Sequence, residues 1–295
     1  MQLKKYKTFF TQKLSSLYPK TEIDTFFFLL VEEYLSFQRI DTVLKADFEI
    51  PSDKFQLLNN ALKRLQNEEP IQYILGKTEF YGFPFLVDKN TLIPRLETEE
   101  LVEWILTEVS KFQSFKVSKL SILDIGTGTG CIPISLKKYL PNTNIFAIDI
   151  SKKALKIAKE NATLNAVDIH FFEADILQIN SLNEVLKQHF DKLSVTVQHN
   201  VKFDIIVSNP PYVRELEKAE IKNNVLKNEP HIALFVEDEN PFIFYKKIAD
   251  LAKIHLTKNG FLFFEINQYL GKETIEMLEK KDFSTIEWRK ELFGN

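Results

Sequence analysis

From residue 119 onward, short apolar runs alternate with stretches of helical periodicity, and this alternation restricts the fold more than any other feature of the chain. The apolar runs are Leu120 to Ile125, Asn144 to Ile148, His170 to Ala174, Phe203 to Val207 and Phe261 to Glu265. Strands that alternate with helices pair in parallel, and they are almost wholly apolar because helices cover both faces of the sheet. The sequence therefore predicts an α/β fold whose strands end along one ligand-binding edge.

The amino-terminal part of the chain has helical periodicity instead. Apolar residues recur at helical spacing between Phe27 and Leu35, after Thr21 and Asp24, which fit a capping box. The pattern returns between Phe55 and Leu65, after Ser52. We predict a small helical bundle over residues 1–68. Its aromatic side chains either fill a core or present a surface to a macromolecular partner.

Between these two parts the pattern changes to short runs rich in Tyr, Phe, Ile and Val. Gly76, Gly82 and Pro84 interrupt the runs, which is typical of strands and turns. We interpret residues 69–94 as a linker that carries a hairpin. A helix is predicted to begin near Thr98, and it opens a second domain over residues 95–295.

The composition disfavours several classes of protein. A formal net charge of -3 gives no general attraction to phosphate backbones, so stable nucleic-acid binding is not expected. The apolar run from Phe26 to Val31 is too short to cross a bilayer. Cys131 is the single cysteine, and with the scattered histidines it offers no metal-ligand cluster. We expect a cytoplasmic protein that binds no membrane and no metal.

The first strand of the predicted sheet runs into a glycine-rich loop. Its sequence is Asp124-Ile125-Gly126-Thr127-Gly128-Thr129-Gly130. Alternate glycines permit a tight turn and close approach of a ligand, and the helix that follows offers free amide donors. A dinucleotide fingerprint would have its third glycine at position 131, where Cys131 stands. The spacing instead resembles the loop of class I methyltransferases, whose cofactor is S-adenosylmethionine, and we expect Asp124, Gly126, Thr127, Gly128 and Gly130 to line it.

Acidic residues follow the next two strands. Asp149 comes at the end of the second strand and Asp175 just beyond the third. A carboxylate in the position of Asp149 can accept both ribose hydroxyls, and Asp175 is placed to meet an adenine amino group. The alternative is that each aspartate only caps the helix that follows it. Carboxylates at successive strand ends favour the binding interpretation.

The fourth strand runs into Ser208-Asn209-Pro210-Pro211-Tyr212. The prolines end the strand and fix the backbone, so that the Pro210 carbonyl and the Asn209 side chain can present two acceptors to one point. A planar NH2 group has two donors, which this pair can satisfy. Tyr212 could add an apolar wall. The alternative is a merely rigid loop. We predict that Asn209, Pro210, Pro211 and Tyr212 hold the substrate and carry the catalysis, with Asn209 also next to the cofactor.

Methyltransferases that act on adenine, on guanine or on glutamine side chains share the tetrapeptide Asn209-Pro210-Pro211-Tyr212, so this tetrapeptide alone does not identify the substrate. The rest of the chain resembles the release-factor glutamine methyltransferases of the HemK/PrmC type. The further segments that carry the resemblance are Pro70 to Gly76, Thr78 to Gly82, Leu92 to Arg95, Glu97 to Glu99, Asn228 to Pro230, Ala233 with Leu234, and Glu291 to Gly294.

The resemblance implies a Rossmann-like class I methyltransferase domain behind a helical amino-terminal domain and a hairpin. It implies methylation of the glutamine side-chain nitrogen in the Gly-Gly-Gln motif of peptide chain release factors, with S-adenosylhomocysteine as the second product. Asn209 and Pro210 would grip the glutamine amide and Asp149 would hold the ribose. Arg95 would help to order the active-site segment. Residues 177–202 form an insertion whose purpose the resemblance does not explain.

Two other functions remain open at this point. An amino-methyltransferase acting on adenine or guanine in DNA or RNA would present the same planar NH2 group to the same acceptors. A binding module that has kept the fold and senses the cofactor without catalysis is the other possibility. The intact tetrapeptide disfavours the binding module, and the lack of an evident basic recognition domain disfavours the nucleic-acid enzyme.

Overall fold

The computed structural model describes residues 1–112, 120–186 and 201–290. The chain divides into two compact units, Met1–Lys77 with Ile221–Asn228, and Thr78–Glu220 with Glu229–Asn295. Residues 187–200 of the insertion at 177–202 lie outside the described residues, and so does the segment 291–294 that contributed to the family resemblance. The boundaries inferred from the sequence put residues 221–228 in the second domain, whereas here they join the first unit.

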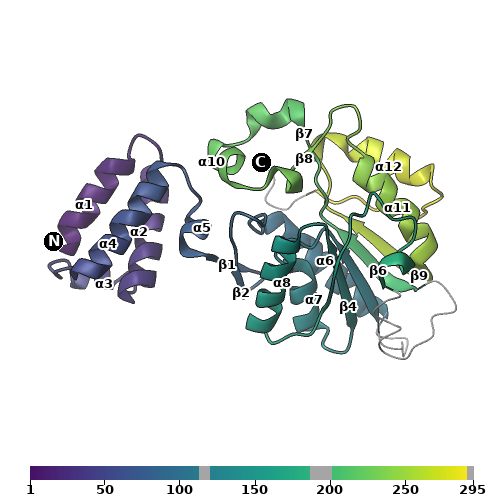
Figure 1. Cartoon of the computed structure of the whole chain (residues 1–295), viewed down its shortest axis with the longest axis horizontal. Helices are drawn as coiled ribbons and strands as arrows, with labels where there is room; N and C mark the ends of the chain where they lie inside the picture. The colour runs from purple at the N-terminus through teal and green to yellow at the C-terminus, as the bar shows by residue number, and fades with distance from the viewer. Residues whose placement is uncertain (113–119, 187–200, 291–295) are drawn as a thin grey trace. The chain divides into compact units, whose positions relative to one another are not determined.

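The first unit is helical. Its helices are α1 (Leu3–Leu14), α2 (Lys20–Leu35), α3 (Asp41–Leu44), α4 (Ser52–Gln66), α5 (Ile71–Leu75) and α10 (Asn223–Asn228) (Figure 1). The aromatic side chains of Tyr6, Phe10 and Phe27 are almost fully buried, and Phe10 and Phe27 meet edge to face with ring centroids 5.7 Å apart. These three aromatics therefore fill the core of the unit, where burial and edge-to-face packing stabilise it.

The capping box expected at Thr21 and Asp24 is wrong. The N-cap of helix α2 is Pro19, two residues before Thr21, and no side chain caps its first turn. Helix α4 likewise starts at Ser52 after Pro51 without a side-chain cap. A proline already has the φ value that leads into a helix, so the chain can enter these helices without a capping side chain.

Helix α10 is fastened to the first unit through Glu68. Lys227 forms an ion pair with the Glu68 carboxylate, and Asn228 Nδ2 donates to the Glu68 carbonyl oxygen at 3.1 Å. Asn228 Nδ2 also donates to the Asn224 carbonyl oxygen at 2.8 Å, inside α10. These polar contacts are long in sequence separation, which is why the sequence pattern alone did not assign the segment to this unit.

A parallel sheet forms the centre of the second unit. Its strand order is β5 (His170–Glu173), β4 (Asn144–Asp149), β3 (Ser121–Ile125), β6 (Phe203–Ser208) and β9 (Leu256–Phe264), and every neighbouring pair is parallel. The predicted α/β fold with a parallel sheet is confirmed. The strand order reverses direction between β3 and β6, which is where ligands bind in open sheets of this kind.

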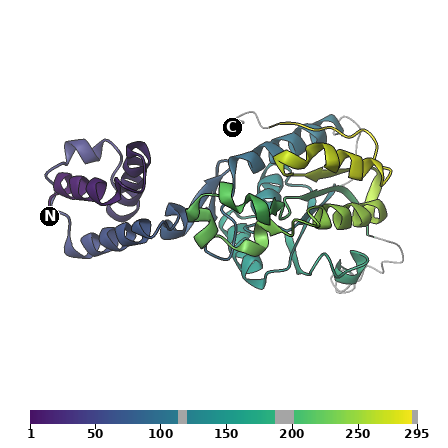
Figure 2. The ribbon, with the colours of Figure 1, turned by 90° about the horizontal axis from the view of Figure 1, so that it is seen from above.

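Helices cover both faces of this sheet. Alternate strand residues such as Ile122 and Val207 pack with α6 (Leu96–Phe112) and α7 (Cys131–Tyr139) on one face. Leu123 and Ile148 pack with α11 (Ile243–His255) on the other face. Helix α12 (Gly271–Glu279) lies beside α11 (Figures 1 and 2). Both faces of the central strands β3, β4 and β6 are thus buried, as their continuous apolar runs indicated, whereas the edge strands β5 and β9 are only partly buried.

The hairpin of β1 (Lys77–Phe80) and β2 (Phe83–Leu86) is part of the second unit's core and not only a linker, because Phe80 and Phe85 are buried there. Asn161 in α8 (Lys152–Leu164) bonds both backbone polar groups of Leu86. The remaining elements are the short strands β7 (Val213–Arg214) and β8 (Phe235–Val236), and the short 3-10 helices η1 (Glu215–Glu220), η2 (His231–Ala233) and η3 (Gln268–Leu270). In the described ranges, no helix is long and apolar enough to span a bilayer.

Candidate active site

The glycine loop and the tetrapeptide lie next to each other at the carboxyl edge of the sheet. Ile125, the last residue of β3, pairs with Ser208, the last residue of β6. The Ser208 hydroxyl donates to the Ile125 carbonyl oxygen at 2.7 Å, in a fully buried position. The loops that follow these strands therefore start from the same level of the sheet, on either side of the point where the strand order reverses (Figure 1).

Two backbone amides fix the turn of the glycine loop. The amides of Gly126 and Thr127 both donate to the Ile148 carbonyl oxygen in β4, at 2.8 and 3.0 Å. Gly126, Gly128 and Gly130 all have φ values between 56° and 79°, a region that strongly favours glycine. A Cβ atom at Gly128 would meet nothing within 4 Å, whereas one at Gly130 would lie 3.1 Å from Ile134 and 3.2 Å from Ala158. Gly128 thus faces open space, and Gly130 is needed for close packing of α7 and α8.

Asp149 connects the glycine loop with the start of α8. Its Oδ2 accepts the Gly128 amide and its Oδ1 accepts the Ser151 amide, both at 2.8 Å. Partial burial raises the pKa of Asp149, and these backbone hydrogen bonds oppose the rise. Because a carboxylate has about four lone-pair directions, each oxygen keeps the capacity to accept a further donor, such as a hydroxyl.

Asp124 and Thr127 are buried polar residues without a described partner. Among the described residues, neither Asp124 oxygen nor Thr127 Oγ1 has a hydrogen-bond partner within the usual distance. Asp124 is 1% exposed, and this burial raises its pKa to about 7; the nearby Thr127 hydroxyl opposes the rise, and the Asp149 carboxylate adds a smaller contribution to it. A buried polar group that lacks a partner is costly, so groups like these are commonly satisfied by a ligand or water.

The structure places Asp175 in a local turn. Its Oδ1 accepts the Leu177 amide at 2.9 Å, and its carbonyl oxygen accepts the Gln178 amide at 3.0 Å. One oxygen of the carboxylate thus caps a turn after β5, whereas the alternative interpretation had it cap a helix. The Oδ2 atom is the one that could face a ligand.

The side chain of Asn209 is held from behind by helix α6. Its Nδ2 donates to Thr98 Oγ1 at 3.2 Å. Within the described part of the chain, no hydrogen bond uses Asn209 Oδ1 or the Pro210 carbonyl oxygen. The side chain of Pro210 is buried, and the backbone of Asn209 lies 3.9 Å from the position of a Cβ atom at Gly126. Among the described residues these two acceptors thus have no partner, and the Asn209 backbone lies next to the glycine loop.

Sequence reasoning missed Thr98 and Glu265, which lie behind the tetrapeptide. Thr98 donates its hydroxyl hydrogen to Glu265 Oε2 at 2.7 Å, and Tyr212 donates its hydroxyl hydrogen to Oε1 at 3.0 Å. Shielding from water raises the pKa of Glu265, and the two hydroxyls, with a smaller contribution from the Asn209 amide, oppose this rise. Tyr212 was expected to hold the substrate as an apolar wall, and the structure adds that its hydroxyl anchors it to Glu265. Glu265 directly follows β9, so the strand-end rule that singled out Asp149 could have found it.

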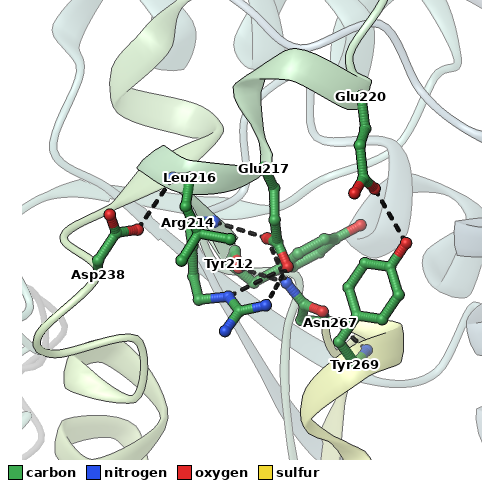
Figure 3. A network of polar contacts seen from close by, with 8 residues as sticks. All are labelled: Tyr212, Arg214, Leu216, Glu217, Glu220, Asp238, Asn267 and Tyr269. Carbon is green, nitrogen blue, oxygen red and sulfur yellow. Dashed lines mark hydrogen bonds and ion pairs between the residues drawn. The ribbon is translucent and has the colours of Figure 1, made fainter.

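A second polar network holds the backbone just after the tetrapeptide (Figure 3). Asn267 Nδ2 donates to the Tyr212 carbonyl oxygen at 3.0 Å and to Glu217 Oε2 at 2.9 Å. Glu217, only 5% exposed, also accepts the Arg214 amide and forms an ion pair with the Arg214 guanidinium at 2.7 Å. These contacts lower the pKa of Glu217 despite its burial. The tetrapeptide is therefore fixed on both sides.

Arg95 holds another nearby segment. Its guanidinium forms an ion pair with Glu229 Oε1 at 2.6 Å, and Glu229 Oε2 accepts the Ile93 amide at 3.1 Å. Glu229 is buried, so this pair fixes the chain that leads into α6 and hence Thr98. In the described ranges, no group of three or more His, Cys, Asp or Glu side chains could hold a metal ion.

Comparisons with known proteins agree with this arrangement. A family model described as a methyltransferase domain matches residues 116–281, and one described as a PrmC N-terminal domain matches residues 8–76. A release factor glutamine methyltransferase from Flavobacterium psychrophilum is 52% identical, over 100% of this chain and 97% of its own. Another from Bacteroides thetaiotaomicron is 39% identical, over 96% of this chain and 94% of its own. With full-length similarity and a methyltransferase domain that spans the sheet and both loops, the chain belongs to the release factor glutamine methyltransferase family.

Proposed function

We propose that this enzyme methylates the side-chain nitrogen of the glutamine in the Gly-Gly-Gln motif of peptide chain release factors. The observation that carries the proposal is the hydrogen bonding of Asn209, whose backbone lies next to the glycine loop: its Nδ2 donates to Thr98, while Oδ1 and the Pro210 carbonyl have no partner among the described residues. A glutamine amide has two N–H donors, and this pair of acceptors can take both. Translation takes place in the cytoplasm, so a release factor substrate also places the reaction there.

The residues around the glycine loop fit S-adenosylmethionine. Gly128 leaves open space in which a side chain would otherwise stand, so a ligand can approach the backbone. Asp124 has buried carboxylate oxygens without a partner among the described residues, and a cationic ligand would satisfy them. We assign Asp124, Gly126, Thr127, Gly128 and Asp149 to the cofactor, with Asp149 at the ribose and Asp175 near the adenine. Gly130 supports the loop by packing.

When bound, S-adenosylmethionine supplies an electrophilic methyl group on a positively charged sulfur and leaves as S-adenosylhomocysteine. The enzyme's own task is to make a poor nucleophile react, because the lone pair of an amide nitrogen is delocalised into its carbonyl. Asn209 Oδ1 and the Pro210 carbonyl orient both N–H bonds and stabilise the positive charge that develops on nitrogen. Pro211 keeps the Pro210 carbonyl in place, since its ring restricts the backbone.

Positioning contributes the rest of the rate enhancement. Holding two reacting groups in a fixed near-attack geometry can remove on the order of 7 kcal/mol of the barrier. Two hydrogen bonds to Tyr212 serve this purpose, because Glu265 holds its side chain and Asn267 holds its carbonyl oxygen. The arrangement is set before the substrate arrives, so little reorganisation is needed during the reaction.

A labelling experiment tests the proposal. The enzyme is incubated with methyl-labelled S-adenosylmethionine and one of three acceptors: a release factor purified without the modification, its variant with the motif glutamine replaced by alanine, or DNA and RNA. We expect label in the unaltered release factor and none in the variant. Label that persists in the variant would place the modification elsewhere, and label in the nucleic acid alone would favour the amino-methyltransferase of nucleobases. Unlabelled acceptors throughout would favour a binding module.

A further inference from the structure

A chain of polar side chains runs from the end of β9 to the Asn209 amide. Glu265 Oε2 accepts the Thr98 hydroxyl hydrogen at 2.7 Å, and Thr98 Oγ1 in turn accepts from Asn209 Nδ2 at 3.2 Å. Thr98 is 2% exposed, so water does not replace it easily. Thr98 comes from α6, Asn209 from the loop after β6, and Glu265 from the residue after β9. Above, Glu265 was assigned only the support of the Tyr212 side chain, and Thr98 no part in the reaction.

The chemistry of these groups fixes the donor-to-acceptor direction of both hydrogen bonds, from Asn209 to Thr98 and from Thr98 to Glu265. A hydroxyl has one hydrogen to donate, and a carboxylate can only accept. Since the Thr98 hydrogen is committed to Glu265, only lone pairs of Thr98 Oγ1 face Asn209. The NH2 end of the Asn209 amide must therefore point toward Thr98, and its Oδ1 must point away. Reversal of the amide would put two lone pairs against each other at Thr98 and would turn a donor toward the substrate.

We propose that Thr98 and Glu265 are positioning residues that select the orientation of the Asn209 amide in which Oδ1 faces the substrate's NH2 group. The proposal rests on the proposed function, because the orientation matters only for a substrate that donates hydrogen bonds. The negative carboxylate is essential to it. A glutamine at position 265 offers an NH2 donor of its own, which can face Thr98 and release the threonine hydrogen toward Asn209.

Tyr212 adds to the same control. Its hydroxyl occupies Glu265 Oε1 at 3.0 Å, and the Tyr245 hydroxyl donates to the Glu265 carbonyl oxygen at 3.1 Å. The Glu265 amide donates to the Ser208 carbonyl oxygen at 3.1 Å, directly before Asn209. Glu265 is thus held through its amide, its carbonyl and both carboxylate oxygens, and it cannot turn away from Thr98 without losing several hydrogen bonds.

The test uses two substitutions at position 98. Thr98→Val keeps the shape of the side chain and removes the hydroxyl, whereas Thr98→Ser keeps the hydroxyl. With the release factor as substrate, we expect kcat of Thr98→Val to fall about 10-fold to 100-fold, as small losses of positioning do. Thr98→Ser should stay within about threefold of the wild type. The affinity for S-adenosylmethionine, measured by calorimetry, should stay within about twofold in both, which also shows that the variants are folded.

Thr274→Val is the matched control. Thr274 is also a buried helical threonine, at 3% exposure, but its hydroxyl donates to the Leu270 carbonyl oxygen in the same helix region. We expect Thr274→Val to lower the melting temperature about as much as Thr98→Val while kcat stays unchanged. Equal losses of kcat in Thr98→Val and Thr98→Ser, or a Thr98→Val enzyme with the wild-type kcat, would overturn the proposal.

A double-mutant cycle separates positioning from general stability. If Thr98 and Glu265 act on the amide of Asn209, then Thr98→Val should cause almost no further loss of kcat in an Asn209→Ala background, and Glu265→Gln should cause only the smaller loss that comes through Tyr212. Losses that multiply would show that they act independently and would contradict the proposal. Glu265→Gln provides a second route should Thr98→Val fold poorly. Wild-type transfer to the release factor is measured first, so a failure of the proposed function is seen separately from a failure of this inference.

Discussion

The glycine loop and the tetrapeptide loop follow neighbouring strands, yet they satisfy their polar groups in opposite ways. Behind the glycine loop, Asp124 and Thr127 are buried with polar atoms that lack a described partner. Around the tetrapeptide, Glu265, Glu217 and Asn267 are engaged by several hydrogen bonds each. The first loop thus has buried polar groups for a ligand to complete, whereas in the second loop the supporting residues are paired before a ligand arrives and only the two acceptors that face the substrate await one.

This difference fits the two tasks at the edge of the sheet. When a ligand supplies hydrogen bonds to buried polar groups that have no partner in the free protein, these groups increase the affinity for the ligand. A loop that must stabilise a developing charge works best when its acceptors are held rigidly, because they need no rearrangement during the reaction. Substitutions in the glycine loop should therefore affect stability or cofactor affinity, and substitutions in the tetrapeptide loop should affect the rate of methyl transfer.

The largest effect is expected for Asn209→Ala. The substitution removes one of the two acceptors, so we expect kcat to fall about 100-fold to 1,000-fold, comparable to the loss of one preorganised partner of a developing charge. The affinity for S-adenosylmethionine should change little, because the glycine loop stays intact. Single-turnover rates and calorimetry with the same preparations measure both quantities. A variant that transfers methyl groups within threefold of the wild type would remove Asn209 from catalysis.

A smaller effect on stability is expected for Asp124→Asn in the absence of cofactor. Burial raises the pKa of Asp124 from 3.8 to about 7, so the folded protein resists ionisation of this group. Its contribution to stability is complete below the ordinary pKa and is lost as the pH rises through about 7. The loss at pH 8 is at most about 4 kcal/mol. We expect the Asp124→Asn substitution to recover about half of this lost stability at pH 8, and not all of it, because the asparagine amide is also left without a partner.

Denaturant unfolding of both proteins at pH 5 and pH 8 measures this effect. At pH 5 the Asp124 side chain is mostly neutral, so the two proteins should differ little. At pH 8 the Asn variant should be the more stable one. An Asn variant that is less stable than the wild type by the same amount at both pH values would mean that Asp124 is ionised and paired in the folded protein.

The smallest effect is expected for Gly128→Ala, and Gly82→Ala is its matched control. Both glycines have positive φ values, 56° and 77°, and at both a Cβ atom would meet nothing within 4 Å. Each substitution should therefore lower the free energy of unfolding by about 1 kcal/mol through backbone strain alone. Only Gly128→Ala should also weaken the affinity for S-adenosylmethionine. Equal affinities of the two variants would show that the open space at Gly128 is not the cofactor position.

The sequence predicted the strands well because burial on both faces makes them continuously apolar. It could not predict the support behind the tetrapeptide to the same degree. Thr98 lies more than a hundred residues before Asn209 in the chain, and only the packing of α6 on the sheet brings their side chains together. Glu265 ends a run that the sequence did identify as a strand. It could have been found by the rule applied to Asp149, since the carboxyl ends of parallel strands share one edge.

Local signals at the chain's irregular segments were less informative. Thr21 and Asp24 satisfy the pattern of a capping box, but Pro19 sets the start of the helix before them. The assignment of Ile221–Asn228 to the helical unit depends on contacts with Glu68, which no periodicity encodes. A hydrogen bond between Asn267 and Glu217 holds the short helix η1 that follows the tetrapeptide, and such side-chain contacts have no sequence signature of their own.

The half-protonated Asp124 has a consequence for the energetics of ligand binding. With a pKa of about 7, this carboxyl carries a proton in a large fraction of molecules at neutral pH. A positively charged group placed beside it favours the ionised form, so part of a proton passes to the solvent for each ligand bound. The measured heat of binding would then vary with the ionisation enthalpy of the buffer, and the pocket would hold a cationic ligand more tightly in mildly alkaline solution than in mildly acidic solution.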